Sequence, residues 1–262
     1  MIARALRSRL GLILEVTVPL AIVAAWWIAS AGSTSFFFPP LSEILDSFRE
    51  TWLFSHVASD VVPSMLRLAA GFAIAIAIAV PLGVLLSQSK LLWRAAEPIV
   101  EFLRALPGPA LIPLGIVLIG IGSGMKIALI AFGCLFPILL TTMDGVASID
   151  PVLRDTVRVL RLSRRDRIMR VIVPAALPQI FAGLRTSLAL GLIMVVISEM
   201  VASENGVGYF VLSAQRSFDL PAMWAGTLMI GLLGYALSGL LTLVERRLLR
   251  WHRASKASAL SS

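Results

Sequence analysis

The 262-residue chain has very little of the chemistry that builds disulfides, metal centres or catalytic sites. Cys134 is its only cysteine and lies within an apolar run, which excludes a disulfide framework or a thiolate metal site within one chain. His56 and His252 are its only histidines and lie far apart in sequence, so the paired-histidine pattern of zinc enzymes is absent. No Gly-x-Ser-x-Gly motif offers a nucleophilic serine. The sequence therefore gives no acid, base, nucleophile and metal set for an enzyme, and it predicts no bound metal or cofactor.

Charged residues are also scarce, at 15% against 58% hydrophobic residues, and the mean hydropathy is +0.91. This is too apolar for a soluble domain. Because a bilayer core of about 30 Å needs roughly 20 apolar residues per helix, we expect an all-α polytopic membrane protein with about six transmembrane helices in a single domain, residues 1–262. That length leaves no room for a soluble catalytic domain. The predicted spans are Leu12–Ala31, Pro63–Leu86, Pro98–Ile119, Met125–Met143, Gln179–Ala202 and Ala222–Val244.

The positive charges are unevenly distributed along the chain, which has a net charge of +8. If the N-terminus is cytoplasmic, all of the 23 Lys and Arg residues except Arg49, Arg67, Lys126 and Arg216 fall on the cytoplasmic side. The positive-inside rule therefore predicts that both termini are cytoplasmic, and it explains the charge without nucleic acid as a partner. The basic first ten residues resemble the start of a signal peptide, but no cleavage site follows, so we expect a retained first helix. The segment 32–62 is then an external connection.

Two features inside the apolar regions invite a functional reading. Gly120–Lys126 is glycine-rich, but Met125 separates Gly124 from Lys126, so it does not match a phosphate-binding loop and we expect a tight turn. Few acidic residues enter the predicted spans: they are Glu15, Glu101, which has Arg104 three residues on, and Glu199. An ion-coupled carrier needs carboxylates within the membrane. Glu199 is the candidate, and an interfacial position or pairing within the bundle explains it at least as well.

The cytoplasmic loop, about residues 144–178, is more elaborate than a simple connection. Asp150 before Pro151 is typical of a helix N-terminus, with Leu153, Val157 and Leu160 on one face and arginines on another. A second short helix is predicted to begin at Ser163, which has capping-box spacing to Asp166, and to end at Pro174. The break between the two helices is expected near Arg161 and Leu162. Such a pair can dock into a partner or lie on anionic lipid headgroups.

These residues resemble a known family. Asp155–Arg164 followed by Val171–Pro178 is similar to the EAA loop of bacterial ABC importer permeases, whose pattern is Glu-Ala-Ala, a glycine four residues later, and Ile-x-Leu-Pro. Three further stretches resemble the branch serving nitrate, taurine and aliphatic sulfonates: Glu101–Leu114, Phe136–Gly145 with Asp150-Pro151, and Glu199–Tyr209. The resemblance covers nearly the whole chain, with four motifs in the expected order.

The resemblance implies a type I ABC importer fold and a position in the bacterial inner membrane. It implies partners: a pair of ABC ATPase subunits that bind ATP and Mg, a second copy of this permease, an external solute-binding protein and membrane lipid. It also implies a coupling helix that enters a groove on the ATPase, with Pro174 and Pro178 in the return to the membrane. By position, the ATPase-coupling residues are Asp155, Thr156, Val157, Arg158, Val159, Leu160, Arg161, Leu162 and Ser163.

The sequence departs from the family pattern at two places in this loop. Asp155-Thr156-Val157 replaces the Glu-Ala-Ala triplet, and Arg161 stands at the glycine position. The left-handed backbone conformation at a helix end costs a residue with a Cβ roughly 1 kcal/mol more than it costs glycine. Arg161 is thus expected to bear that strain, to shift the break by one residue or to contact an acidic site on the ATPase.

The substrate and the translocation pathway are less well specified by the sequence. Small anions such as a sulfonate, taurine or nitrate fit the resemblance best, and thiamine- or riboflavin-type precursors are the alternative. A secondary carrier or channel without ATP coupling, or a membrane-embedded enzyme or scaffold, are the competing functions. The candidate pathway residues are Thr141, Thr142, Ser198, Glu199 and Met200.

Overall fold

The computed structural model describes residues 2–160 and 162–249, among which it contains helices and no strand. Side chains are described at these positions except 2–13, 15, 16, 54, 154 and 158. The all-α fold class predicted from the sequence is confirmed. The α-helices are α1 (Ile2–Ser30), α2 (Leu41–Glu50), α3 (Val62–Leu86), α4 (Lys90–Ala105), α5 (Ile112–Ile119), α6 (Ser123–Ala147), α7 (Pro151–Val159), α8 (Arg164–Asp166), α9 (Val173–Val201), α10 (Val207–Arg216) and α11 (Leu220–Leu248). Four shorter helical turns are Thr51–Ser55, Val57–Val61 and Arg167–Ile172, of π geometry, and Gly108–Leu111, of 3-10 geometry.

The chain forms two compact units. The first, here the aromatic unit, comprises Met1–Val57 and Phe210–Met229. Within it Trp26 and Trp224 have ring centroids 6.1 Å apart, and the backbone N–H of Leu41 donates to Ser30 Oγ, which fixes the start of α2. The second, here the bundle unit, comprises Ala58–Tyr209 and Ile230–Ser262.

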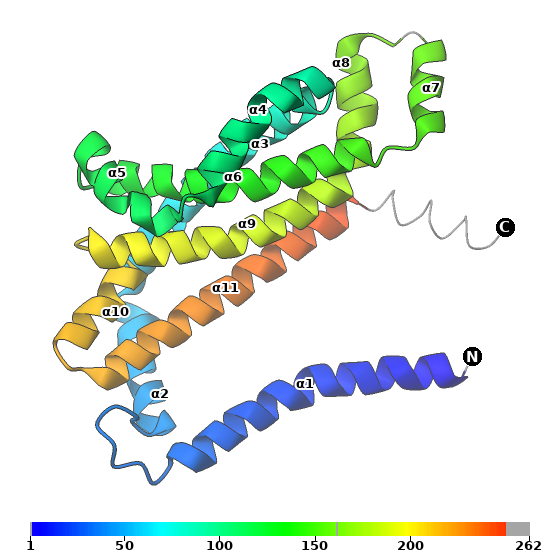
Figure 1. Ribbon diagram of the computed structural model, residues 1–262. Helices are drawn as coiled ribbons and strands as arrows, with labels where there is room; N and C mark the ends of the chain where they lie inside the picture. Colours follow the sequence, from blue (N-terminus) through cyan, green and yellow to red (C-terminus); the bar gives the residue numbers. More distant parts are fainter. Residues whose placement is uncertain (1, 161, 250–262) are drawn as a thin grey trace. The chain divides into compact units, whose positions relative to one another are not determined.

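Helices α3, α6 and α9 pack against one another as the centre of the bundle unit (Figure 1). Glycines allow this close approach, because a Cβ added at Gly71 would lie 2.7 Å from the Cβ of Ile130, and one at Gly83 would lie 2.9 Å from the Cβ of Thr142. Apolar side chains offer little net attraction between helices in lipid, so close backbone packing at small residues becomes a main stabilising contribution. The second half of α11 runs along α9, where Arg185 pairs with Glu245 (Figure 1).

Four helical segments among the described residues are long and apolar enough to cross a bilayer, or five if one bent pair counts as a span. In α1 the apolar stretch among the residues with described side chains is Thr17–Ser30. The six predicted runs therefore correspond to four long helices, one bent pair and α1. The four long segments are Val57–Leu86, Ser123–Ala147, Arg164–Val201 and Leu220–Leu248.

The predicted third span is not a straight helix. Helix α4 and the segment Gly108–Ile119 meet at an angle of 87°. Leu106 and Pro107 at the bend have extended backbone, with ψ of 123° and 118°. Proline disfavours helical geometry in the residue before it and lacks an N–H, so Pro107 ends α4 where the hydropathy continues.

The prediction that Pro174 ends the second loop helix is wrong. Helix α8, the π turn Arg167–Ile172 and α9 form one continuous helical segment of 38 residues, Arg164–Val201, which contains both Pro174 and Pro178. Pro174 lies in the first turn of α9, directly after the π turn. The changed hydrogen-bond spacing of a π turn accommodates a residue without an N–H, so the helix continues.

Candidate functional site

A helical hairpin, α7 followed by α8, stands at the end of the bundle unit where α6 finishes (Figure 1). Helix α7 begins as the sequence predicts, because Asp150 Oδ1 accepts a hydrogen bond of 2.8 Å from the N–H of Val152, with Pro151 in the first helical position. An aspartate cap satisfies an amide that has no partner within the helix, and its charge is favourable at the helix N-terminus. The first arm of the hairpin is therefore encoded locally.

The second arm begins at the predicted capping box. Ser163 Oγ accepts from the N–H of Asp166 at 3.1 Å and donates to Asp166 Oδ2 at 2.6 Å. Asp166 also forms an ion pair with Arg170 at 3.0 Å, one turn further along. The hairpin break falls between Val159 and Arg164, as the sequence predicts.

The expected coupling residues occupy this break and the end of α7. Val157 is buried, at 6% exposure, whereas Val159 and Leu160 are 81% and 63% exposed. The tip thus exposes aliphatic side chains while one valine anchors the arm. Arg161 and the side chain of Arg158 lie outside the described residues. Asp155, Thr156, Leu162 and Ser163 are exposed, and Thr156 Oγ1 donates to the carbonyl of Val152 at 2.8 Å.

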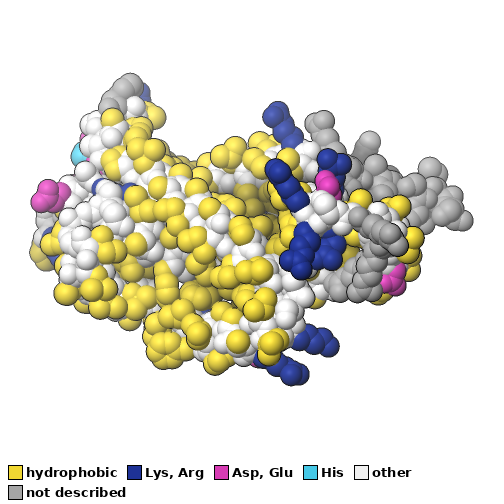
Figure 2. All heavy atoms as spheres, turned by 90° about the horizontal axis from the view of Figure 1, so that it is seen from above, with side chains coloured by type: hydrophobic (Ala, Val, Ile, Leu, Met, Phe, Trp, Pro, Cys, Tyr) yellow, Lys and Arg dark blue, Asp and Glu magenta, His cyan; other side chains and the backbone are white. Residues whose placement is uncertain are grey.

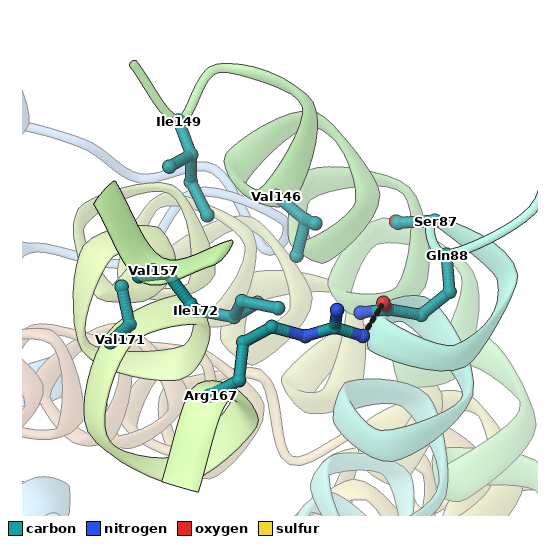
Figure 3. Close-up of a pocket in the computed structure, with 8 residues that line it drawn as sticks. All are labelled: Ser87, Gln88, Val146, Ile149, Val157, Arg167, Val171 and Ile172. Atoms are coloured by element: carbon teal, nitrogen blue, oxygen red, sulfur yellow. Dashed lines mark hydrogen bonds between the residues drawn. The ribbon is translucent and has the colours of Figure 1, made fainter. Parts of the chain in front are cut away.

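A cavity of about 250 Å³ lies at the root of the hairpin. Figure 3 shows that Arg167 extends across it towards Gln88, which follows α3, and Arg167 Nη2 donates to Gln88 Oε1 at 3.1 Å. Val157 from α7 and Ile172 from the π turn line the same cavity. The Arg167–Gln88 hydrogen bond and an incompletely filled apolar root therefore join the hairpin to the ends of α3 and α6.

The surface around the hairpin is basic, whereas most of the surrounding surface is hydrophobic. Figure 2 shows Lys and Arg side chains gathered near the end that carries α8, with a largely hydrophobic surface over the spans. Arg164, Arg165 and Arg170 belong to this part of the chain and are exposed. A basic end bordering an apolar band is the distribution expected at a cytoplasmic membrane surface.

The candidate pathway residues of α6 are engaged within the bundle unit. Thr142 is fully buried and its hydroxyl donates to the carbonyl of Ile138 at 2.6 Å, whereas half-buried Thr141 donates to the carbonyl of Pro137 at 2.7 Å. Those of α9 lie near its end. Ser198 and Glu199 are fully buried, and Met200 is half-buried.

Glu199 is paired within the bundle, which is one of the two explanations that the sequence left open for this residue. Its carboxylate accepts from Arg67 Nη1 at 2.7 Å, from Ser64 Oγ at 2.8 and 2.9 Å, and from the N–H of Gly208 at 3.1 Å. The side chains of Arg67 and Glu199 are 8% and 0% exposed. A buried charge requires such a partner, because an unpaired one carries a large desolvation cost.

The sequence did not identify Arg67, which it assigned to the outer surface, as the partner of Glu199. Arg67 also donates to Asn205 Oδ1 at 2.5 Å and to Ser123 Oγ at 3.1 Å, so it joins α3 to α6 and to the turn after α9. Asp60 accepts from the N–H of Gly206 at 2.8 Å and fixes the same turn. These contacts, here the polar staple, lie at the opposite end of α3, α6 and α9 from the hairpin.

Comparison with known proteins matches residues 71–250 to the family described as binding-protein-dependent transport system inner membrane component. The putative aliphatic sulfonates transport permease protein SsuC of Bacillus subtilis (strain 168) is 30% identical over 251 residues, covering 95% of this chain and 91% of the relative. The taurine transport system permease protein TauC of Escherichia coli (strain K12) is 29% identical over 265 residues, covering 95% of each chain. A chain of the inward-facing MetNI methionine ABC transporter shares the fold, with a TM-score of 0.63 and 20% identity over 72% of this chain and 94% of that chain.

Proposed function

The chain belongs to the family of binding-protein-dependent transport system inner membrane components and is a permease subunit of an ABC transporter, and we propose that its α7–α8 hairpin receives mechanical work from a separate ATPase. The observation that carries this proposal is the hairpin itself, with exposed Val159 and Leu160 at its tip and Val157 anchored at its root. A short amphipathic helix with unpartnered aliphatic residues fits a groove on another protein. ATP and Mg bind that partner and not this chain.

The assembly proposed around this chain follows the family. Two copies of the permease form the translocation pathway, a pair of ATPase subunits binds the hairpins, and an external solute-binding protein delivers the cargo. In this proposal both chain termini are cytoplasmic, as is the basic hairpin. The whole chain acts as one permease domain in this assembly. When the ATPase pair closes on ATP, the hairpins move and the long helices tilt between inward-open and outward-open states.

The proposed cargo is a small organic anion carrying a sulfonate or a similar oxyanion group. The relatives named for aliphatic sulfonates and for taurine support this class, because both kinds of solute carry a sulfonate. A secondary carrier is disfavoured, since Glu199 is sealed against Arg67 and is thus poorly placed to bind and release a coupling ion.

Leu160→Asp tests the role of the hairpin. A carboxylate at a tip that enters an apolar groove loses the contact and adds a desolvation cost, so we expect loss of ATPase co-purification and of ATP-driven uptake. Deletion of residues 155–162 should have the same effect, while the purified permease remains monodisperse in detergent. Val152→Asp is the matched control, because Val152 is 71% exposed on the first turn of α7, where a carboxylate is favourable. Undiminished substrate-stimulated ATP hydrolysis by the Leu160→Asp importer would refute the assignment.

A further inference from the structure

A second cavity of about 350 Å³ lies in the bundle unit, away from both the hairpin and the polar staple. Its walls come from the bend after α4, from α6 and from α9. Phe132 and Phe136 face it from the middle of α6, and Ile193 and Met194 from the second half of α9. Since α6 is a 25-residue span, residues near its centre lie close to the middle of the hydrocarbon layer.

One charged side chain, Arg104, lines this cavity. Its Nε lies 2.8 Å and its Nη2 2.6 Å from Glu101 Oε2, and each side chain is 47% exposed. A charged group at this depth is unfavourable against lipid, so it is expected to face a water-filled space or another protein surface. The charge distribution along the chain predicted a cytoplasmic position for Arg104, but most of the residues that line the cavity with it belong to the middle parts of α6 and α9.

This ion pair differs in one decisive respect from the Arg67–Glu199 pair of the polar staple. Arg67 and Glu199 are enclosed and their polar atoms are shared among several partners, so they have no surface to offer a solute. Arg104 and Glu101 are each half exposed, and Arg104 lines the cavity. A guanidinium in that position keeps donors free and matches the geometry of sulfonate or carboxylate oxygens.

The remaining wall of the cavity is apolar. The rings of Phe132 and Phe136 meet edge to face with centroids 5.1 Å apart. Met194 lies between two glycines, since a Cβ at Gly108 would be 2.8 Å from its Sδ and one at Gly133 would be 3.1 Å from its Cγ. A flexible thioether in such a gap adapts to solutes of different shape. The wall therefore suits the carbon portion of a small organic anion.

We propose that this cavity is the transient cargo site of the permease, where Arg104 binds the oxyanion group of a small organosulfonate and the Phe132, Phe136 and Met194 wall contacts its carbon chain. This inference rests on the proposed function and names the site and substrate class for it. Glu101 competes with the cargo for the Arg104 guanidinium. That competition keeps binding weak, and a conducting site requires weak binding so that the solute leaves as readily as it enters.

The test measures the charge preference of the cavity without a known cargo. The permease–ATPase complex is placed in lipid nanodiscs with Cys134→Ser, which removes the native thiol, and Ile193→Cys, which adds a thiol where the side chain is 52% exposed and lines the cavity. The labelling rate of an anionic reagent, sulfonatoethyl methanethiosulfonate, is compared with that of its trimethylammonium analogue, each normalised to its rate with a free thiol. We expect the anion to react roughly tenfold faster, because a cleft of one charge concentrates counter-ions.

Variants assign the preference to the pair. Arg104→Gln should abolish it, Arg104→Lys should largely retain it, and Glu101→Gln should increase it. Arg216→Gln, at an exposed arginine of α10, is the matched control and should leave the ratio unchanged. A normalised ratio near one in the parent, or a ratio that survives Arg104→Gln, would overturn the proposal.

Uptake separates this inference from the proposed function. Proteoliposomes containing the full importer and its solute-binding protein are assayed with radiolabelled taurine and ethanesulfonate. Loss of uptake in Arg104→Gln, with wild-type assembly, supports the cargo site. Full uptake in Arg104→Gln refutes the site and leaves the importer function standing. An anion preference in a complex that never shows ATP-driven uptake of any solute would refute the importer function and leave the anion site standing.

Discussion

Replacing Arg67 with methionine tests whether the polar staple holds α3, α6 and α9 together. Methionine keeps an apolar stem of similar length but removes the charge and all the donors. Glu199, which is 0% exposed, would retain the Ser64 hydroxyl and the Gly208 amide but lose the positive charge 2.7 Å away. Asn205 would lose the donor that now lies 2.5 Å from its Oδ1.

The expected effect follows from what the substitution leaves buried. Removing one partner of a buried ion pair costs about 3–5 kcal/mol, because the other charge remains without compensation. The lost contacts to Asn205 and Ser123 add about 1 kcal/mol each in net terms. Rearrangement of the turn after α9 offsets part of this, so we expect Arg67→Met to lower the free energy of unfolding by about 4 kcal/mol.

A double-mutant cycle isolates the pair. The purified permease in mixed micelles is unfolded by titration with sodium dodecyl sulfate and followed by far-ultraviolet circular dichroism. Glu199→Gln keeps the shape of the side chain and removes its charge. The double variant should therefore be more stable than the sum of the single effects predicts, by about 2 kcal/mol or more.

Two results would refute this reasoning. One is a change of less than about 1 kcal/mol for Arg67→Met, well below the cost of an unpaired buried charge. The other is additivity of the two substitutions within about 0.5 kcal/mol, which is the behaviour of independent sites. Arg216→Gln, at an exposed arginine, provides the baseline and should change stability by no more than about 0.5 kcal/mol.

Two further substitutions test the packing and the hairpin. Gly71→Ala should lower the thermal midpoint measured by fluorescence-detected gel filtration, because the new Cβ would lie 2.7 Å from that of Ile130; Gly231→Ala, whose Cβ meets open space, should not, and equal midpoints would contradict the packing argument. Ser163→Ala should destabilise the start of α8 by about 1 kcal/mol and speed hydrogen exchange at the Asp166 amide, whereas Ser163→Thr should keep its protection; unchanged exchange in both would show that the cap is dispensable.

The sequence predicted well those features that local chemistry decides. Asp150 and Ser163 mark helix starts because a side-chain oxygen satisfies an amide two or three residues away, and both caps are present. The apolar runs located the spans because burial in lipid depends on the length and composition of a segment, which are also local properties. Hydropathy does not indicate the direction of a helix axis, so the 87° bend at Pro107 was not predicted. Pro174 was misread because the effect of a proline depends on whether the preceding turn adapts.

The sites were harder to derive than the helices because their parts are distant in sequence. Glu199 was noted as ionisable within an apolar run, but its partner Arg67 lies on another helix and was counted as an external charge. A usable signal was present: Arg67 and Glu199 lie at corresponding ends of two predicted spans and have opposite charge. Arg104 and Glu101 showed the same signal within one turn. The exposure of the side chains separates a structural ion pair from one that can meet a solute. That exposure is known only once the packing of the helices is known.

The continuous helical segment Arg164–Val201 connects the hairpin, the proposed cargo cavity and the polar staple of the bundle unit. It begins at the hairpin, lines the root cavity through Ile172, lines the proposed cargo cavity through Met194 and ends at Glu199 in the polar staple. Had it ended at Pro174, as the sequence suggested, movement of the hairpin would be absorbed at a flexible joint. The segment does not end there, although it changes direction between α8 and α9 (Figure 1), and its far end is held by the polar staple. The proposed function therefore predicts that displacement of the hairpin reaches the wall of the proposed cargo cavity along this segment.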